Sequence, residues 1–206
     1  MSARRLTLAR FTLAGLLLAM LGACVGAARE PVDSLSGLGD VETVVVGRID
    51  LVPPLRKDEQ KLNGLGTGRF ENKIFLITDE HYRVLKDEPG MADYAGRIEA
   101  TLGKNFFVGS DSKPFYILGG MLYLDLGGAD TNRAYFPGGL KVDLRPGDRA
   151  VYIGTIRYHR NEFFEITKAV IVDDYARANA EFKKKYGAKY SLRKALLTPV
   201  KVGKKD

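Results

Sequence analysis

The sequence predicts a mainly β protein, an antiparallel β-sandwich that ends in a C-terminal helix or helical pair. Runs of β-branched and aromatic residues, each bounded by turn-forming residues, recur between Val41 and Val172. No helical pattern alternates with these runs, which favours an antiparallel sandwich over a parallel α/β sheet. After Val172 the apolar residues change to helical spacing, so the helical part is expected at the C-terminal end.

The first expected strand is the run VETVVVGRIDLV at residues 41–52, which Pro53 and Pro54 close because neither can donate a backbone hydrogen bond. At residues 140–144 apolar and charged residues alternate, which is the period of a strand with one solvated face. Further strands are expected at residues 73–78, 105–108, 151–158 and 163–172, with two more inside 114–126.

Turn residues set the limits of these strands. Gly119 and Gly120 separate two apolar runs and predict a tight hairpin, because both central residues of such a turn need positive φ. The Pro-Gly pair within residues 145–148 predicts a second turn, and residues 159–162 join two long strands in a third. Residues 79–103 follow neither period and are expected to hold a short helix or a long loop.

The C-terminal helix is expected to begin after Asp173 or Asp174, whose carboxylates can cap its free amide groups, and to end at Gly187. Apolar residues at helical spacing mark the face that packs on the sandwich: Tyr175, Ala178, Phe182 and Tyr186. Three lysines in the last turn complement the helix dipole. A second short helix is expected at residues 191–197.

The N-terminal residues have the pattern of an export signal. Residues 1–10 carry three arginines and no acid, and residues 11–21 are apolar. A membrane-spanning helix needs about 20 apolar residues. The shorter run, which ends before Gly22, therefore predicts a removable signal and not a permanent transmembrane anchor.

The signal ends in Leu21-Gly22-Ala23-Cys24, which resembles the lipobox of bacterial lipoproteins. The resemblance implies that the Cys24 thiol receives a diacylglycerol, that the chain is cut between Ala23 and Cys24, and that the new amino group is acylated, for example with palmitate. Two or more acyl chains are what stable anchoring requires. The alternative is an ordinary signal that is cut after Ala28 and discards Cys24.

We therefore expect four parts: a signal peptide at residues 1–23, a flexible tether at 24–40, a sandwich domain at 41–172, and a C-terminal helix with a basic tail at 173–206. Removal of the signal takes away three arginines and no acid, so the net charge falls from +7 to +4. Cys24 is the single cysteine, so the mature body has no thiol that can misform disulfides in an oxidising compartment.

No motif for catalysis stands out, so we expect no cofactor and no enzyme activity. The alternative is an enzyme whose site is not visible in the sequence. His81 and His159 are too few for an imidazole metal site. Residues 125–132, DLGGADTN, offer oxygen ligands but not the calcium-binding register of an EF-hand, so a plain turn is favoured. The glycines of residues 64–70 lack the strand and helix that flank a phosphate-binding loop.

The C-terminal residues 183–206 hold nine Lys or Arg residues and one acid. Such a run ordinarily forms a solvated face or tail. The functional alternative is contact with an anionic surface such as lipid headgroups, which contributes about 1 kcal/mol for each nearby basic residue. The residues expected to make that contact are Lys183, Lys184, Lys185, Lys189, Arg193 and Lys194.

Residues 135–158, YFPGGLKVDLRPGDRAVYIGTIRY, resemble the prealbumin-type or carboxypeptidase-regulatory-type sandwich modules of many bacterial lipoproteins. These modules share no catalytic residues, so the resemblance implies a fold and not a reaction. Together with the lipobox, it implies a membrane-anchored envelope protein that acts as a binding or structural module. The expected partners are the membrane, another envelope protein or peptidoglycan, and not nucleic acid.

The residue that follows the cysteine bears on the destination of a lipoprotein. In enterobacterial lipoproteins an Asp at this position favours retention at the inner membrane. This chain has Val25 there. The resemblance therefore implies a lipid-anchored location at the outer membrane.

Overall fold

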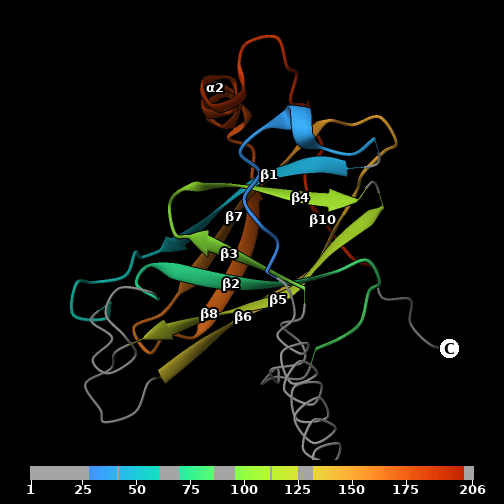
Figure 1. The fold of residues 1–206 in the computed structure, drawn as a ribbon. Coiled ribbons are helices and arrows are strands. Elements are labelled where there is room, and N and C mark those ends of the chain that lie inside the picture. The colour runs from blue at the N-terminus through green and yellow to red at the C-terminus, as the bar shows by residue number, and fades with distance from the viewer. Residues whose placement is uncertain are drawn as a thin grey trace, which may run out of the picture.

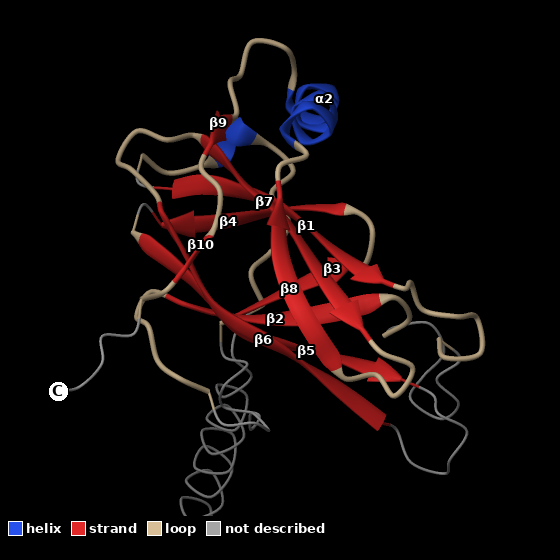
Figure 2. Ribbon diagram, turned by 180° about the vertical axis from the view of Figure 1, so that it is seen from behind, coloured by secondary structure: helices blue, strands red, loops and turns tan. Residues whose placement is uncertain are grey.

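The computed structural model describes residues 28–40, 42–60, 70–85, 96–111, 113–124 and 132–201. In this part of the chain two five-stranded sheets form a sandwich, and one α-helix packs outside it (Figure 1). Figure 2 shows the same arrangement from behind, with helix α2 (Tyr175–Tyr186) beyond the end of the crossed strands. The prediction of a mainly β sandwich with a C-terminal helix is confirmed.

The first sheet has the strand order β4-β1-β7-β8, and the short β9 also pairs with β7. Its strands are β1 (Glu42–Val52), β4 (Asn105–Asp111), β7 (Ala150–Arg160), β8 (Ile166–Val172) and β9 (Arg193–Lys194). The second sheet has the order β10-β6-β5-β2-β3. Its strands are β2 (Lys73–Asp79), β3 (Arg97–Thr101), β5 (Pro114–Leu124), β6 (Asn132–Asp143) and β10 (Thr198–Pro199).

The pairing at the centre of the first sheet is parallel, contrary to the antiparallel pairing expected throughout. Strand β1 runs in the same direction as β7, from Val44 opposite Ala150 to Val52 opposite His159. The run from Val44 to Val46 is fully buried, because the sandwich core covers one face of β1 and the helical segments cover the other. A continuous apolar run of this kind is typical of a parallel strand that is buried on both faces.

The expected hairpin at Gly119-Gly120 is wrong, because both glycines lie inside the continuous strand β5. Neither has positive φ. A Cβ atom at Gly120 would lie 3.1 Å from the carbonyl oxygen of Phe75, and one at Gly119 would lie 3.2 Å from that of Phe136. These glycines therefore allow a close approach of the neighbouring strands, which is the other common reason for glycine in a strand.

Residues 79–103, which the pattern left undecided, contain strand β3. The turn at residues 145–148 is confirmed, with Gly147 at φ +87°. Strands β7 and β8 pair as the expected antiparallel hairpin.

Helix α2 follows Asp174 and ends before Gly187, as the sequence predicts. The second short helix expected at residues 191–197 is wrong. The amide groups of Ala195 and Leu197 instead donate to the carbonyl groups of Tyr152 and Ile153, each at 2.9 Å. The open edge of β7 offers backbone partners here, and this tertiary contact overrides the local helical preference.

The N-terminal segment from Ala28 to Asp40 packs against the sandwich, so the expectation of a flexible tether through residue 40 is wrong. Ala28 pairs with Arg97 on the edge strand β3, and Pro31 pairs with Val108 on the edge strand β4. Leu35, in the short 3-10 helix η1 (Leu35–Gly37), is 2% exposed. This segment thereby joins the two sheets along one side, and Figure 1 shows it in blue as it crosses β3 and β4.

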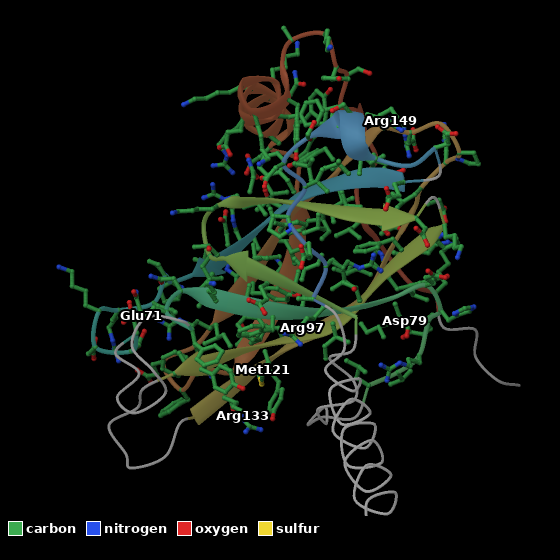
Figure 3. All side chains as sticks on the ribbon, in the orientation of Figure 1. Glu71, Asp79, Arg97, Met121, Arg133 and Arg149 are labelled. Atoms are coloured by element: carbon green, nitrogen blue, oxygen red, sulfur yellow. The ribbon has the colours of Figure 1, made fainter. Side chains whose placement is uncertain are left out.

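Arg149 fixes the end of this segment. Its guanidinium group donates to the backbone oxygens of Leu35 at 2.7 Å, Gly39 at 3.1 Å and Leu38 at 3.4 Å. Figure 3 labels Arg149 beside η1. Because η1 provides few backbone bonds of its own, Arg149 supplies the polar contacts that hold it on the sheet.

Two apolar clusters hold the layers together. The larger lies between the sheets and includes Phe115, Phe136 and Tyr158. The Tyr158 hydroxyl donates to the backbone oxygen of Pro137 at 2.9 Å and so links β7 to β6, and burial raises the pKa of Tyr158. The smaller cluster lies between the first sheet and α2, around Tyr152 and the fully buried Phe182.

Replacing Phe182 with Ala should destabilise the protein by about 3 to 5 kcal/mol, because it empties the centre of the smaller cluster. Chemical denaturation of the purified protein measures this change. Phe163→Ala is the matched control, since that ring is 75% exposed and its loss should cost little. Equal effects at both positions would contradict the placement of α2 on the sheet.

Candidate functional site

The predicted lipidation site lies outside the described residues, which begin at Ala28, so the structure places neither Ala23 nor Cys24. The described chain nevertheless begins close to them, four residues after Cys24. One parallel bridge holds it there: Ala28 lies opposite Arg97, and the Arg29 amide donates to the Arg97 carbonyl at 2.8 Å. Ala28 and Arg29, which follow the predicted anchor by four and five residues, are therefore part of the fold.

The Arg29 side chain extends this attachment into the sandwich. Its Nε donates to the Thr78 hydroxyl at 3.0 Å, and its Nη1 lies 3.3 Å from both the Gly109 carbonyl and the Ser110 hydroxyl. The guanidinium carbon stands 5.2 Å from the centre of the Phe115 ring. These partners come from β2, β4 and β5, so one side chain connects both sheets.

Burial lowers the pKa of Arg29 below its ordinary value, although the carboxylates of Asp111, Glu80 and Asp79 act in the opposite direction. Arginine stays charged in proteins even so. Its role is therefore that of a fixed cation within a hydrogen-bonded cluster. Arg29 lies within the tether predicted at residues 24–40, and nothing in the local pattern of small residues indicates its contacts with β2 and β4.

The six basic residues named for an anionic surface do not share one environment. Lys185 is 2.9 Å from Asp33, Lys194 is 2.9 Å from Asp173, and Arg193 is bound to Asp148. Lys189 stands 5.0 Å from the centre of the Tyr190 ring. Lys183 and Lys184 are exposed on α2.

The acidic partners Asp33, Asp148 and Asp173 come from three separate segments of the chain. Half of the proposed cationic surface is therefore committed to internal ion pairs. Lys183 and Lys184 are exposed with no ion pair assigned to them, and Lys185, Lys189 and Lys194 are also exposed although they have the partners given above.

The Arg193 pair closes the turn between β6 and β7. Arg193 Nε donates to Asp148 Oδ1 at 2.7 Å, and a second bond joins Nη2 to Oδ2. Burial acts to raise the pKa of Asp148, but the bonds from Arg193 and from the Arg145 amide outweigh it and lower that pKa. Arg193 therefore has a structural role, because its guanidinium group binds Asp148 in the β6–β7 turn.

A second arginine is buried at the opposite end of the sandwich. Arg160 and Glu59 have side chains that are 4% and 2% exposed, with Nη2 and Oε2 2.9 Å apart. The guanidinium also donates to the backbone oxygens of Pro53 and Pro54, and it lies 4.2 Å from the centre of the Phe164 ring. A buried pair with this many bonds holds the loop after β1 in place, and removing one partner would leave a buried charge.

Open grooves lie on the surface. One of about 500 Å³ runs over β3 and β4 and is lined by Glu99, Lys104 and Lys185, among others. Another, of about 380 Å³, includes Arg48, Asp50 and Arg157. In that groove both arginines face the Asp50 carboxylate, with the Arg48 Nε 2.6 Å from Asp50 Oδ1. The negative charge of Asp50 is therefore largely neutralised.

A third groove, also of about 380 Å³, lies between residues 82–85 and strands β5 and β6. Its walls are mainly apolar and aromatic: Tyr82, Leu85, Leu118, Tyr135 and Phe136. Such a lining can bind an apolar or aromatic group, and the described residues of this groove bring no nucleophile and base together.

The two histidines do not form a site with each other. The side chain of His81 is 90% exposed, with Nδ1 4.0 Å from Asp79, and His159 lies on β7. Among the described residues, no group of three His, Cys, Asp or Glu side chains could hold a metal ion. Residues 64–69 of the glycine-rich run and 125–131 of DLGGADTN lie outside the described residues.

No protein family, no curated protein and no solved structure matches this chain. The likeness of residues 135–158 to prealbumin-type modules therefore stays a prediction. Within the described residues, no helix has the length and apolarity needed to cross a membrane.

Replacing Arg193 with Ala should destabilise the protein by about 1.5 to 3 kcal/mol at pH 7, because it removes charge-assisted bonds to Asp148. The pKa of Asp148 is lowered by folding, so this stability is present above its ordinary value of 3.8 and is lost as the pH falls through the lowered value. Urea titrations at pH 7 and at about pH 2.5 should therefore show a smaller effect in acid.

The matched control is Lys183→Ala, an exposed residue of the same basic run. It should leave the free energy of unfolding nearly unchanged at both pH values. A destabilisation by Arg193→Ala that is the same at both pH values would contradict the assigned ion pair.

Proposed function

We propose that this chain is an exported envelope protein that is anchored by lipid at Cys24, and that its sandwich acts as a non-catalytic binding or structural module. The observation that carries the proposal is the lipobox-like Leu21–Cys24 at the end of the apolar signal. The partners are the membrane, through the anchor, and another component of the envelope, either a protein or peptidoglycan.

The packing of the N-terminal segment supports cleavage before Cys24 over cleavage after Ala28. A chain cut after Ala28 would lose the residue that pairs with Arg97 and would place a charged amino terminus on Arg29. A chain that begins at Cys24 keeps both contacts. The fold and the proposed processing are therefore compatible without any rearrangement of this segment.

The ion pairs that carboxylates form with arginines support a binding or structural role. Asp50, Glu59 and Asp148 each face an arginine across a short distance. The pair at Asp50 lies within strand β1, whereas the pairs at Glu59 and Asp148 hold a loop and a turn in place. Catalytic acids and bases are usually groups whose environment adjusts their pKa for proton transfer within a cleft. These carboxylates instead serve as fixed partners of arginine side chains.

Intact-mass measurement of protein extracted from membranes should show the loss of residues 1–23 and the added mass of the acyl chains. Cys24→Ala should abolish this modification, because no other thiol can accept the lipid. The variant should stay as uncut precursor or leave the membrane. A wild-type protein that is soluble and begins at Arg29 would overturn the proposal.

Separation of the two membranes on a sucrose gradient should place the protein with outer-membrane markers, because Val25 lacks the acidic side chain associated with retention. Val25→Asp is the paired variant and should move the protein toward the inner-membrane fractions. Wild-type protein in the inner-membrane fractions would contradict this location while leaving the lipid anchor itself intact.

A further inference from the structure

The lipid anchor proposed at Cys24 would lie close to a fixed point on the sandwich. Four peptide units connect the Cα atoms of Cys24 and Ala28, and a fully extended chain can span at most about 14 Å over that number. Ala28 is held in place by its bridge to Arg97, in which the Arg29 amide donates to the Arg97 carbonyl, and by the side-chain bonds of the adjoining Arg29. The body therefore has no long connector with which to stand away from the bilayer.

The surface around Ala28 is one end of the sandwich, which we call the anchor pole. It comprises Ala28 and Arg29, the start of β3 at Arg97, the end of β2 at Asp79 with the adjoining Glu80, and the β4–β5 turn at Asp111 and Lys113. Arg29 reaches the Gly109 carbonyl and the Ser110 hydroxyl just before this turn. Figure 3 labels Arg97 and Asp79, which locate the pole in the molecule.

The opposite end is formed by the connection of β7 to β8 at residues 161–165, which we call the distal hairpin. Strand β7 begins at the level of the anchor pole, because Ala150 lies opposite Val44 of β1 and Val44 lies opposite Gly109 of β4. Its 11 residues rise about 3.3 Å each, so β7 extends roughly 33 Å from that level to the distal hairpin. The Asn161 side-chain oxygen accepts from the amides of Phe163 at 2.9 Å and Glu165 at 3.0 Å. The distal hairpin is thus internally bonded, and it exposes the Phe163 ring.

We infer that the anchor pole lies directly against the lipid headgroups and that the distal hairpin faces away from the membrane. This inference rests on the proposed lipidation of Cys24. The anchor pole carries Asp79, Glu80 and Asp111 as well as Arg29 and Lys113, so its charges are mixed. The contact therefore follows from the short covalent reach and not from attraction to anionic lipid, and salt leaves it unchanged.

Two variants with one added cysteine test this orientation. Lys113→Cys places a thiol at the anchor pole and Glu162→Cys places one on the distal hairpin, and both positions are exposed. With Cys24 acylated, the added thiol is the only one available for a fluorescent dye. The lipidated variants are reconstituted in phosphatidylcholine vesicles that contain a nitroxide-headgroup lipid, which quenches over a short range.

The dye at position 113 should be quenched several-fold more than the dye at position 162, equally at low and high salt. A third variant, Asp111→Cys, places the dye at a second position of the anchor pole, where quenching should equal that at position 113. Equal quenching at the two ends, in protein whose acylation is confirmed by intact mass, would overturn the orientation and leave the proposed function standing. Protein that carries no acyl mass would overturn both.

A longer connector provides the matched control. Inserting about twelve Gly and Ser residues after Val25 adds a root-mean-square reach of about 19 Å. In Lys113→Cys with this insert, quenching should fall to the level of position 162, while the acyl mass stays the same. Quenching that persists with the insert would overturn the inference, because the surface would then bind the bilayer through its own affinity.

Discussion

Strand β1 pairs with β4 on one edge and with β7 on the other, and the rest of the fold depends on this double pairing. Since β1 and β7 are parallel, the chain leaves β1 at one end of the sheet and has to return to the opposite end before β7 begins. The intervening residues make that return as strands of the second sheet and as β4. Ile49 and Leu51 of β1 then form part of the core between the sheets. The buried run at Val44–Val46 is the sequence feature that makes a central position for β1 favourable.

A sandwich built in this way has open edges, and the two ends of the chain close part of them. The segment that begins at Ala28 pairs with β3 and then with β4, so it spans the side between the two sheets. The C-terminal residues pair with β7 through β9 and then with β6 through β10. Unpaired strand edges favour association with other chains. The terminal segments thus satisfy backbone groups that would otherwise be exposed, and they tie the sheets together on two sides.

Features with a local cause could be predicted from the sequence. The alternation that ends at Leu144, the turn at Gly147 and the apolar face around Phe182 each follow from a short pattern, and the structure contains all three. Features that depend on distant residues could not. A glycine that allows a close approach between strands cannot be told from a turn glycine by its neighbours in sequence, which is why the predicted turn at Gly119 is wrong. Residues 191–197 are extended because β7 lies beside them and offers backbone partners. For the candidate site the same limit holds: the lipobox is a local motif, whereas the partners of Arg29 and Arg193 lie far along the chain.

The use of the N-terminal segment in the fold has an energetic reason that is separate from anchoring. Ordering a residue costs about 1 to 2 kcal/mol of conformational entropy, so a segment of this length stays ordered only if its contacts offset that cost. Burial of Leu35, the backbone bonds to β3 and β4, and the hydrogen bonds of Arg29 and Arg149 provide those contacts. A flexible segment would avoid the entropic cost but would leave the edges of β3 and β4 open. Because the residues that close these edges begin only four positions after the proposed anchor at Cys24, the interactions that stabilise the sandwich would, if Cys24 is lipidated, also limit how far it can stand from the membrane.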